Sequence, residues 1–501
     1  MSSINLDFVK GLEMNDLAQE NPINDDEAEP VISGSEVALE VEEVEGGIEV
    51  EIEGPPLHLI ASALSRFVHK VHDIEESAKN CIPQARKAYI RRAKELQSTF
   101  LSAQEVLDSD CSAEEKLVAA RNLRTMLRLA KRLSNDATIV TLERSLFIGL
   151  FTCFDKFVGE LMEGVYSIRS DLFKGVGAQF SVCDVLEYPS LDEFKSAVLE
   201  KEIETVRRKS YGEQFKEFEK RFGFETLTKF DSWPAFIEAS QRRNLFTHCD
   251  GVISQQYLKV CTEAGYKPAK EDIVGSQLEI GAKYFYQTCH LVMEVGVMLG
   301  HTIWRKMLPD ERRQADSELN SLIYDYLHLG QYHKAAALCR FAQKMPKISE
   351  DLMDRMFTLN HAIAVRQMNG AAAAKKILEK KDWSAVIYDF RLARAVLVED
   401  YVSAKEYMLK IGKAGEVVVE EAYHDWPLFK DFRETPEFLE GYEEVFGYKY
   451  LSKLSEIVSD AQVVAEQHAA EEEQKEKEKE KESAVEADLV MDVDSGFSDK
   501  S

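Results

Sequence analysis

Residues that interrupt helices are scarce in this chain. Only 12 prolines and 25 glycines occur among 501 residues, and long stretches consist mainly of alanine, leucine, glutamate and lysine, which favour helices. A chain of this length with 45% hydrophobic residues can form two or three domains with substantial cores. The sequence therefore predicts an all-α protein with more than one domain.

The acidic charge of the chain is concentrated at its two ends. The formal net charge is −27, which would argue against a nucleic-acid partner if it were spread evenly. Residues 1–54, however, hold 16 acidic side chains against one lysine, and residues 460–501 hold 14 against 5. Residues 55–300 carry 33 basic and 34 acidic side chains, so this middle part is nearly neutral.

Both acidic ends are expected to lie outside the folded domains. The tail, residues 459–501, has few apolar residues to bury, which predicts a solvated helix or a disordered extension. In the N-terminal arm, residues 1–54, the segments 37–41 and 48–52 alternate apolar and acidic residues around Gly46-Gly47, a pattern typical of a β-hairpin. A disordered acidic arm is the alternative.

Targeting and metal-binding patterns do not appear in the sequence. The chain has no run of 18 apolar residues, and its first residues lack the basic and apolar regions of a signal peptide. Its 8 cysteines are scattered from Cys81 to Cys339, without a Cys-x-x-Cys pair or clustered histidines. We therefore expect a soluble, cytoplasmic protein with no membrane contact, no cofactor and no metal site.

Hydrophobic periodicity divides the first half of the chain into helices. Pro55-Pro56 marks the start of the folded part, and a helical extension is expected over residues 55–139. Its three helices would begin near residue 57, at Pro83 and after an N-cap at Ser112, and the last two would end near residues 107 and 133. A helical bundle is expected over residues 140–305, with helices at about 141–167, 191–208, 211–222, from Trp233 onward and at about 278–304. The first of these five is apolar on nearly all sides, which requires burial.

The hexapeptide at residues 243–248 is the strongest functional signal. It reads RNLFTH and is followed closely by Asp250-Gly251. An arginine can clamp a phosphate and a histidine can transfer a proton near neutral pH, which is a minimal set for phosphodiester cleavage without a metal. Positions five apart lie about 140° apart around a helix, so Arg243 and His248 can converge only if the helix ends or distorts near His248. Asp250-Gly251 predicts such an end.

Together with the helix order, these residues resemble HEPN domains, the helical bundles of many metal-independent ribonucleases. The family motif is an arginine, a short spacer whose first residue is often polar, and a histidine; here the spacer begins with Asn244. An apolar helix with a central acidic residue, Asp155, precedes the motif. The resemblance covers residues 140–305 and implies a homodimer, or a higher oligomer, in which two copies of the motif share one cleft.

The resemblance also implies roles for individual residues. An RNA substrate would be cleaved by attack of the ribose 2′-hydroxyl, which leaves a 2′,3′-cyclic phosphate. His248 would be the general base or acid, Arg243 would hold the phosphate, and Asn244 would orient the histidine or the substrate. Glu238 would pair with Arg243 or tune His248, and Asp155 would support the site if its helix faces the cleft. The alternative is that the cations only complement the helix dipole at its C-terminal end.

Residues 306–458 follow a different pattern. The segment Leu329-Gly330-Gln331-Tyr332, with Ala335, resembles the Leu-Gly-x-Tyr-x-x-Ala core of tetratricopeptide (TPR) repeats. Related segments begin near Met368 and Glu399, at offsets of about 40 and about 30 residues instead of the 34 of that family. The resemblance implies a short TPR-like α-solenoid that binds a protein partner or contributes oligomer contacts.

Two functions are consistent with these patterns. The first is a HEPN-type endoribonuclease that acts in anti-phage defence, as a toxin or in a stress response. The second is a non-catalytic, dimeric interaction scaffold that binds protein partners through its helical repeats. The complete set of Arg243, Asn244 and His248 favours the first, since a purely structural bundle does not need all three.

Overall fold

The computed structural model describes residues 58–175 and 180–450 of the chain. Within these residues the protein is all-α, as expected, and its only extended pairings are two isolated β-bridges. The chain divides into two compact units, Met1–Ala315 and Asp316–Ser501, so the boundary lies beyond the expected one at residue 305. The expected β-hairpin at residues 37–52 and the acidic tail at residues 459–501 lie outside the described residues.

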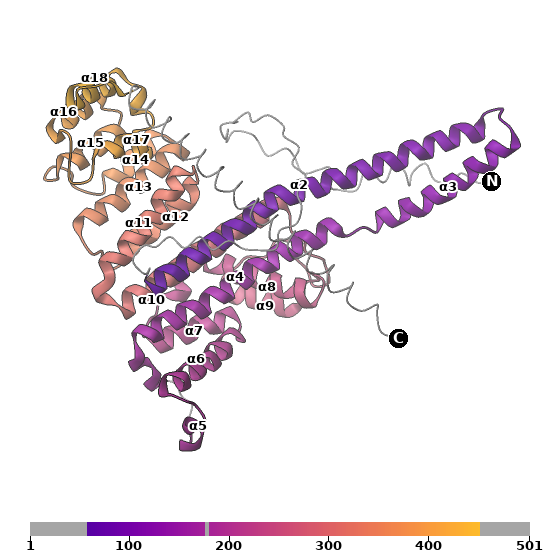
Figure 1. The fold of residues 1–501 in the computed structure, drawn as a ribbon, viewed down its shortest axis with the longest axis horizontal. Helices are drawn as coiled ribbons and strands as arrows, with labels where there is room; N and C mark the ends of the chain where they lie inside the picture. Colours follow the sequence, from indigo (N-terminus) through magenta and orange to yellow (C-terminus); the bar gives the residue numbers. More distant parts are fainter. Residues whose placement is uncertain (1–57, 176–179, 451–501) are drawn as a thin grey trace, which may run out of the picture. The chain divides into compact units, whose positions relative to one another are not determined.

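A long helical hairpin begins the first unit. It consists of α2 (Leu59–Asp108) and α3 (Ala113–Ser134), and α3 runs back along the distal half of α2 (Figure 1). The expected N-cap at Ser112 is confirmed, because its side chain accepts a hydrogen bond from the backbone N–H of Glu115 and the Glu115 carboxylate accepts from the backbone N–H of Ser112. The expected helix break at Pro83 is wrong, because α2 continues through it. Pro83 is exposed, so water can hydrate the carbonyl group that its missing N–H leaves unpaired.

The remaining helices of the first unit form a bundle with the proximal half of α2. They are α4 (Thr138–Ile168), α5 (Val182–Leu186), α6 (Leu191–Arg207), α7 (Tyr211–Phe222), α8 (Trp233–His248), α9 (Gln255–Glu263) and α10 (Ala282–Met307). Most of these bounds agree with the expected helices to within a few residues. Short 3-10 helices lie at Ser170–Gly175, Leu227–Lys229 and Pro309–Glu311.

The apolar helix α4 is the centre of this bundle. Four of its phenylalanines, Phe147, Phe151, Phe154 and Phe157, recur every three or four residues and are almost fully buried. Their rings contact aromatic rings of α2, α7, α8 and α10. The burial that the sequence required for this helix is therefore confirmed, and the bundle places α7 and α8 beside it.

Helices α2 and α10 approach each other closely at Gly296. A Cβ atom at this position would lie 2.2 Å from a ring carbon of Phe67, whose side chain is buried and stacked on Phe157. One turn later, a Cβ atom at Gly300 would lie 2.7 Å from a methyl carbon of Leu64. Two glycines on one face of α10 therefore allow the first turns of α2 to pack against it.

The second unit contains helix pairs joined by tight turns. Its helices are α11 (Arg312–His328, which spans the boundary), α12 (Tyr332–Lys344), α13 (Asp351–Asn369), α14 (Ala371–Leu378), α15 (Tyr388–Leu397), α16 (Tyr401–Ile411), α17 (Glu420–Asp425) and α18 (Pro436–Phe446). The turns α11–α12, α13–α14 and α15–α16 contain Gly330, Gly370 and Glu399, all with positive φ. These are the three places where the sequence pattern recurs, so each recurrence marks a helix–turn–helix.

Candidate functional site

Helix α8 carries the RNLFTH hexapeptide and ends where the sequence predicts. His248 is its last residue, and the backbone N–H groups of Cys249 and Gly251 both donate to the carbonyl of Leu245. Asp250 and Gly251 have φ values of 50° and 81°. A Cβ atom at Gly251 would lie 2.7 Å from the Phe246 ring, so glycine is required there for both conformation and space.

The turn after α8 is fixed by two side chains. Arg144 of α4 forms an ion pair with the Asp250 carboxylate, and its guanidinium lies 5.1 Å from the centre of the Phe246 ring. Gln277 donates to the Asp250 carbonyl at 3.0 Å, next to an isolated β-bridge between Val252 and Gln277. The position of the helix end is therefore set by α4 and by the segment that leads into α10, in addition to the turn itself.

Arg243 points from α8 toward α4 and α7. Its Nη2 atom donates to the hydroxyl of Tyr211 at 3.0 Å and lies 3.7 Å from Oδ2 of Asp155. The guanidinium also lies 5.7 Å from the centre of the Phe151 ring and 5.6 Å from that of Tyr211. Two of the predicted site residues, Arg243 and Asp155, are thus brought together, and each keeps 23% of its side-chain surface exposed.

Tyr211 joins these two residues and was not predicted as part of the site. Its hydroxyl donates to Oδ1 of Asp155 at 2.8 Å while it accepts from Arg243. It is the first residue of α7, placed there by a capping box between Ser210 and Glu213. The sequence does contain the Ser-x-x-Glu signal, but that signal locates the start of the helix and carries no information on which other helices the tyrosine contacts.

Burial shifts the pKa values of this network. It raises the pKa of the Asp155 carboxyl, and the hydrogen bond from Tyr211 and the charge of Arg243 partly offset this rise. Burial, together with the adjacent Asp155, raises the pKa of Tyr211 well above its ordinary value. The phenol therefore stays protonated and acts as a hydrogen-bond donor at neutral pH. The Nε atom of Arg243 is buried and makes no hydrogen bond within the described residues.

Glu238 lies on another side of α8 and pairs with Arg242, not with Arg243. Its carboxylate accepts from Nε of Arg242 at 2.8 Å and from the hydroxyls of Tyr257 and Tyr284 at 2.6 and 2.7 Å. The expected pairing with Arg243 is therefore corrected. Residues four apart share a helix face, whereas residues five apart do not. Glu238 is only 2% exposed and ties α8 to α9 and α10.

Asn244 and His248 lie on a third side of α8. They are four residues apart, so they share a face, and His248 is exposed while Asn244 is half-buried. Neither side chain makes a hydrogen bond to the described part of the chain. Within one chain, Arg243 and His248 are separated by about 140° around the helix and roughly 7.5 Å along it. The structure therefore does not bring these two together in a single copy.

Two further properties limit what the site can hold. Among residues 58–175 and 180–450, no group of three or more histidine, cysteine, aspartate or glutamate side chains could hold a metal ion. Within the same residues, the stretch Ala113–Ile168 contains one window long and apolar enough to cross a membrane by length and composition alone. Only 22% of that window is buried in the structure, although α4 packs its phenylalanines inside the bundle.

The α8 site thus consists of a positioned arginine and, about 140° away around the helix, an exposed histidine at the helix end. These residues offer phosphate binding and proton transfer on separate faces of one helix. Comparison of the chain with protein-family models, with curated proteins and with solved structures finds no match.

Proposed function

We propose that the protein is a metal-independent endoribonuclease of HEPN type, with Arg243, Asn244 and His248 as its catalytic residues. The observation that carries the proposal is the position of RNLFTH over the last six residues of α8, with the helix stop immediately after it. This position fixes the arginine against the bundle and leaves the histidine exposed at the end of the helix.

In the proposed reaction the ribose 2′-hydroxyl oxygen attacks the adjacent phosphorus. A bond forms between O2′ and phosphorus while the bond between phosphorus and O5′ breaks, which gives a 2′,3′-cyclic phosphate and a 5′-hydroxyl end. A histidine acting as general base takes the proton of the 2′-hydroxyl, and a histidine acting as general acid protonates O5′. Arg243 stabilises the negative charge that builds on the phosphate oxygens.

The proposal includes a second copy of the chain. In one copy His248 and Arg243 lie on different faces of α8, so a single phosphate cannot contact both side chains directly. The face that carries Asn244 and His248 is open near the helix end, where His248 is exposed. Pairing two such faces would place His248 of each copy close to the other copy and would supply one base and one acid.

The wider fold supports the same proposal. The first unit would be a HEPN-like bundle, and the helix pairs of the second unit, with turns at Gly330, Gly370 and Glu399, would form a TPR-like array that binds a protein partner. A cytoplasmic nuclease of this kind fits a role in anti-phage defence, as a toxin or in a stress response. The partner would recruit or restrain the nuclease.

One observation favours the scaffold alternative. Arg243 makes a hydrogen bond to Tyr211 and an ion pair with Asp155, so it has a structural role in joining α4, α7 and α8 that a non-catalytic bundle would also retain. In that case His248 would be an ordinary exposed residue at the end of a helix. The two functions differ in their dependence on His248, because its side chain makes no contact that a scaffold needs.

The test is cleavage of a panel of unstructured RNAs by the full-length protein in the presence of a chelator. We expect cleavage with cyclic-phosphate ends, loss of at least about 100-fold in rate for His248→Ala, and an unchanged rate for Thr247→Ala. Thr247 is the matched control, because it is the exposed neighbour whose hydroxyl bonds only to its own helix. An RNA with 2′-methoxy groups should resist cleavage. If His248→Ala cleaves as fast as the wild type, or if every RNA stays intact, the scaffold function replaces the nuclease.

A further inference from the structure

The α2–α3 hairpin carries two stretches rich in positive charge in an acidic protein, although the tip between them, residues 95–115, holds six acidic and no basic side chains. We refer to residues 84–94 and 116–134 as the basic arm. No acidic residue occurs from Ser77 to Lys94 on α2 or from Lys116 to Asn135 on and after α3. Apart from Lys79, which forms an ion pair with Glu76, nine exposed cations lie in these two stretches: Lys87, Arg91, Arg92, Lys94, Arg121, Arg124, Arg128, Lys131 and Arg132.

The cations of α3 form one row. The spacing of Arg121, Arg124, Arg128, Lys131 and Arg132 places them within about 100° of the helix circumference and along roughly 16 Å of its length. Ala119, Ala130 and Leu133, which are buried, mark the opposite side of α3. The row therefore lies on the side of α3 that is turned away from α2.

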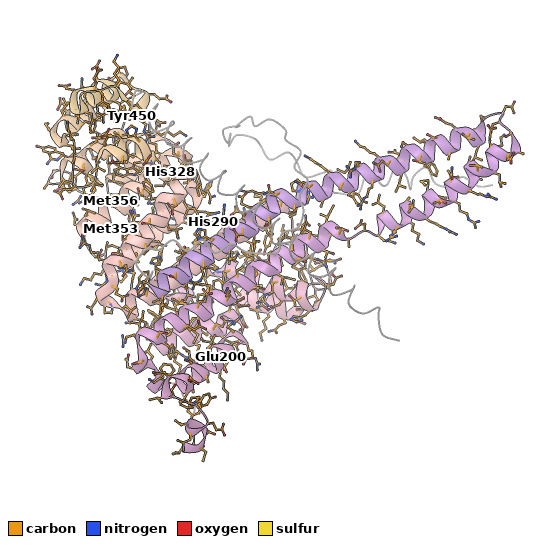
Figure 2. All side chains as sticks on the ribbon, in the orientation of Figure 1. Glu200, His290, His328, Met353, Met356 and Tyr450 are labelled. Atoms are coloured by element: carbon orange, nitrogen blue, oxygen red, sulfur yellow. The ribbon has the colours of Figure 1, made fainter. Side chains whose placement is uncertain are left out.

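A second, shorter row lies on α2. Lys87, Arg91 and Lys94 follow the i, i+4, i+7 spacing of one helix face, and the buried Ala103 lies on roughly the opposite face. The two rows thus lie on the outer sides of the hairpin, which projects beyond the bundle in Figure 2. Positive charge consequently surrounds the arm instead of covering one flat face.

Most of these cations have no carboxylate partner within the described part of the chain. Of the nine, Arg91 lies 3.9 Å from Glu95 in an exposed pair. The hydrogen bonds from Thr138 lower the pKa of Asp136, and the charges of Arg92 and Arg132 contribute to this shift. By contrast, Arg86 at the base of the arm is half-buried and forms an ion pair with Glu143 of α4 at 2.9 Å. Like charges at i, i+3 and i, i+4 destabilise a helix by about 0.2–0.5 kcal/mol per pair. The two rows therefore lower the stability of their helices, and ion pairs within the described residues do not compensate for this loss.

We propose that the basic arm binds the phosphate backbone of RNA and so holds the substrate of the proposed nuclease. A flexible strand can follow charge around both sides of a hairpin, whereas a membrane surface meets only one side of it. Single-stranded nucleic acid is also bound mainly through cations that follow its backbone. The identity of RNA as the ligand rests on the proposed function, while binding through the arm can be tested independently of cleavage.

The experiment measures binding of full-length protein to a fluorescent single-stranded RNA whose riboses are all 2′-methoxy, so that cleavage does not interfere. The arm variant replaces Arg121, Arg124, Arg128, Lys131 and Arg132 by glutamine. The control variant replaces five exposed lysines of the second unit by glutamine: Lys375, Lys376, Lys380, Lys413 and Lys430. Both variants lose the same charge, and circular dichroism checks that both keep their helices.

We expect the arm variant to bind RNA at least about tenfold more weakly at 0.1 M salt, and the control variant to bind within about twofold of the wild type. The slope of log affinity against log salt should become shallower by about 0.7 for each lost phosphate contact, and so by up to about 3.5. Equal weakening in both variants would show that only net charge matters and would overturn the proposal. Absence of RNA binding by the wild type, or tighter binding of the arm to anionic phospholipid vesicles or to an acidic polypeptide than to RNA, would overturn it as well.

The two proposals can fail separately. If the 2′-methoxy RNA binds through the arm while unmodified RNA stays intact, the nuclease function is wrong and the arm remains an RNA-binding surface. If RNA is cleaved with equal affinity and rate by the arm variant and the wild type, the arm proposal is wrong and the nuclease function stands.

Discussion

Replacing Tyr211 by phenylalanine removes a single oxygen atom from the centre of the α8 site. The ring of Tyr211 packs edge-to-face on Phe154 at 5.4 Å and lies 5.5 Å from the ring of Phe236, and a phenylalanine would keep both contacts. The hydroxyl makes two short hydrogen bonds, to Asp155 at 2.8 Å and from Arg243 at 3.0 Å, and a long one of 3.5 Å to the carbonyl of Phe151. The substitution therefore removes the polar contacts of the hydroxyl and keeps the ring contacts.

The magnitude of the effect follows from the charges of the partners. A hydrogen bond to a charged group contributes about 1.5–3 kcal/mol, so two of them set an upper limit of roughly 3–6 kcal/mol. Part of this loss would be recovered, because Arg243 and Asp155 are already 3.7 Å apart and can move into direct contact. We expect the first unit to lose about 2–3 kcal/mol of its unfolding free energy.

The assay compares the urea unfolding of the wild type, Tyr211→Phe, Asp155→Asn and the double variant. Unfolding is monitored by the fluorescence of Trp233, with the other tryptophans replaced by phenylalanine in all four proteins. Because both residues act through one network, the double variant should lose at least about 1 kcal/mol less than the sum of the single losses. The pKa of Asp155 should also rise further in Tyr211→Phe, since the hydrogen bond from the phenol lowers it. A loss below about 0.5 kcal/mol together with additive single effects would refute the account of Tyr211 as the link between α4 and α8.

Two further predictions concern the bundle itself. Burial, together with the nearby Arg305, lowers the pKa of His301 to about 3 from the ordinary 6.5, so below pH 6.5 the unfolded chain takes up a proton that the folded protein does not. As pH falls, this histidine therefore lowers the unfolding free energy of the wild type, by up to about 5 kcal/mol between pH 7 and pH 3. The urea midpoint of His301→Gln should consequently depend less on pH over this interval than that of the wild type. Gly296→Ala should lower the free energy of unfolding by about 1–3 kcal/mol in thermal unfolding, because its Cβ would overlap Phe67. Gly149→Ala on α4 is the control: its Cβ would be 3.9 Å from its nearest neighbour, so the substitution should be neutral or stabilising. Equal unfolding midpoints for the two variants would contradict the close packing of α2 on α10.

Local patterns in the sequence predicted those structural features that depend on neighbouring residues. The N-cap at Ser112, the start of α7 at Tyr211 and the helix stop at Asp250-Gly251 were all readable, because each depends on residues within one turn. The break at Pro83 was wrong for the same reason. A proline weakens a helix locally, but α2 also packs on α4, whose Glu143 pairs with Arg86 about one turn beyond Pro83 and lies far along the chain.

The contacts of the site depend on distant residues and were only partly predictable. Asp155 and Tyr211 are 56 positions apart, and Tyr211 and Arg243 are 32 apart. No spacing rule connects them, so Asp155 was identified only through a resemblance and Tyr211 was missed. The ion pair of Glu238 with Arg242 could have been predicted, because Arg242 lies four residues after Glu238 and shares its helix face, whereas Arg243 lies five residues after it.

The length of α2 has a consequence for the rate at which a ligand is captured. Beyond Arg86, the last residue of α2 with an ion pair to α4, the helix continues to Asp108, a distance of about 33 Å. The Debye length is only about 8–10 Å at physiological ionic strength, so charges farther away than this contribute little to the potential around the arm. An approaching polyanion would therefore encounter mainly the local field of the hairpin, in which the two cationic rows lie next to six carboxylates at residues 95–115. Association should be fast at low ionic strength and slow steeply as salt is added, as expected for electrostatic steering by a small part of an acidic protein.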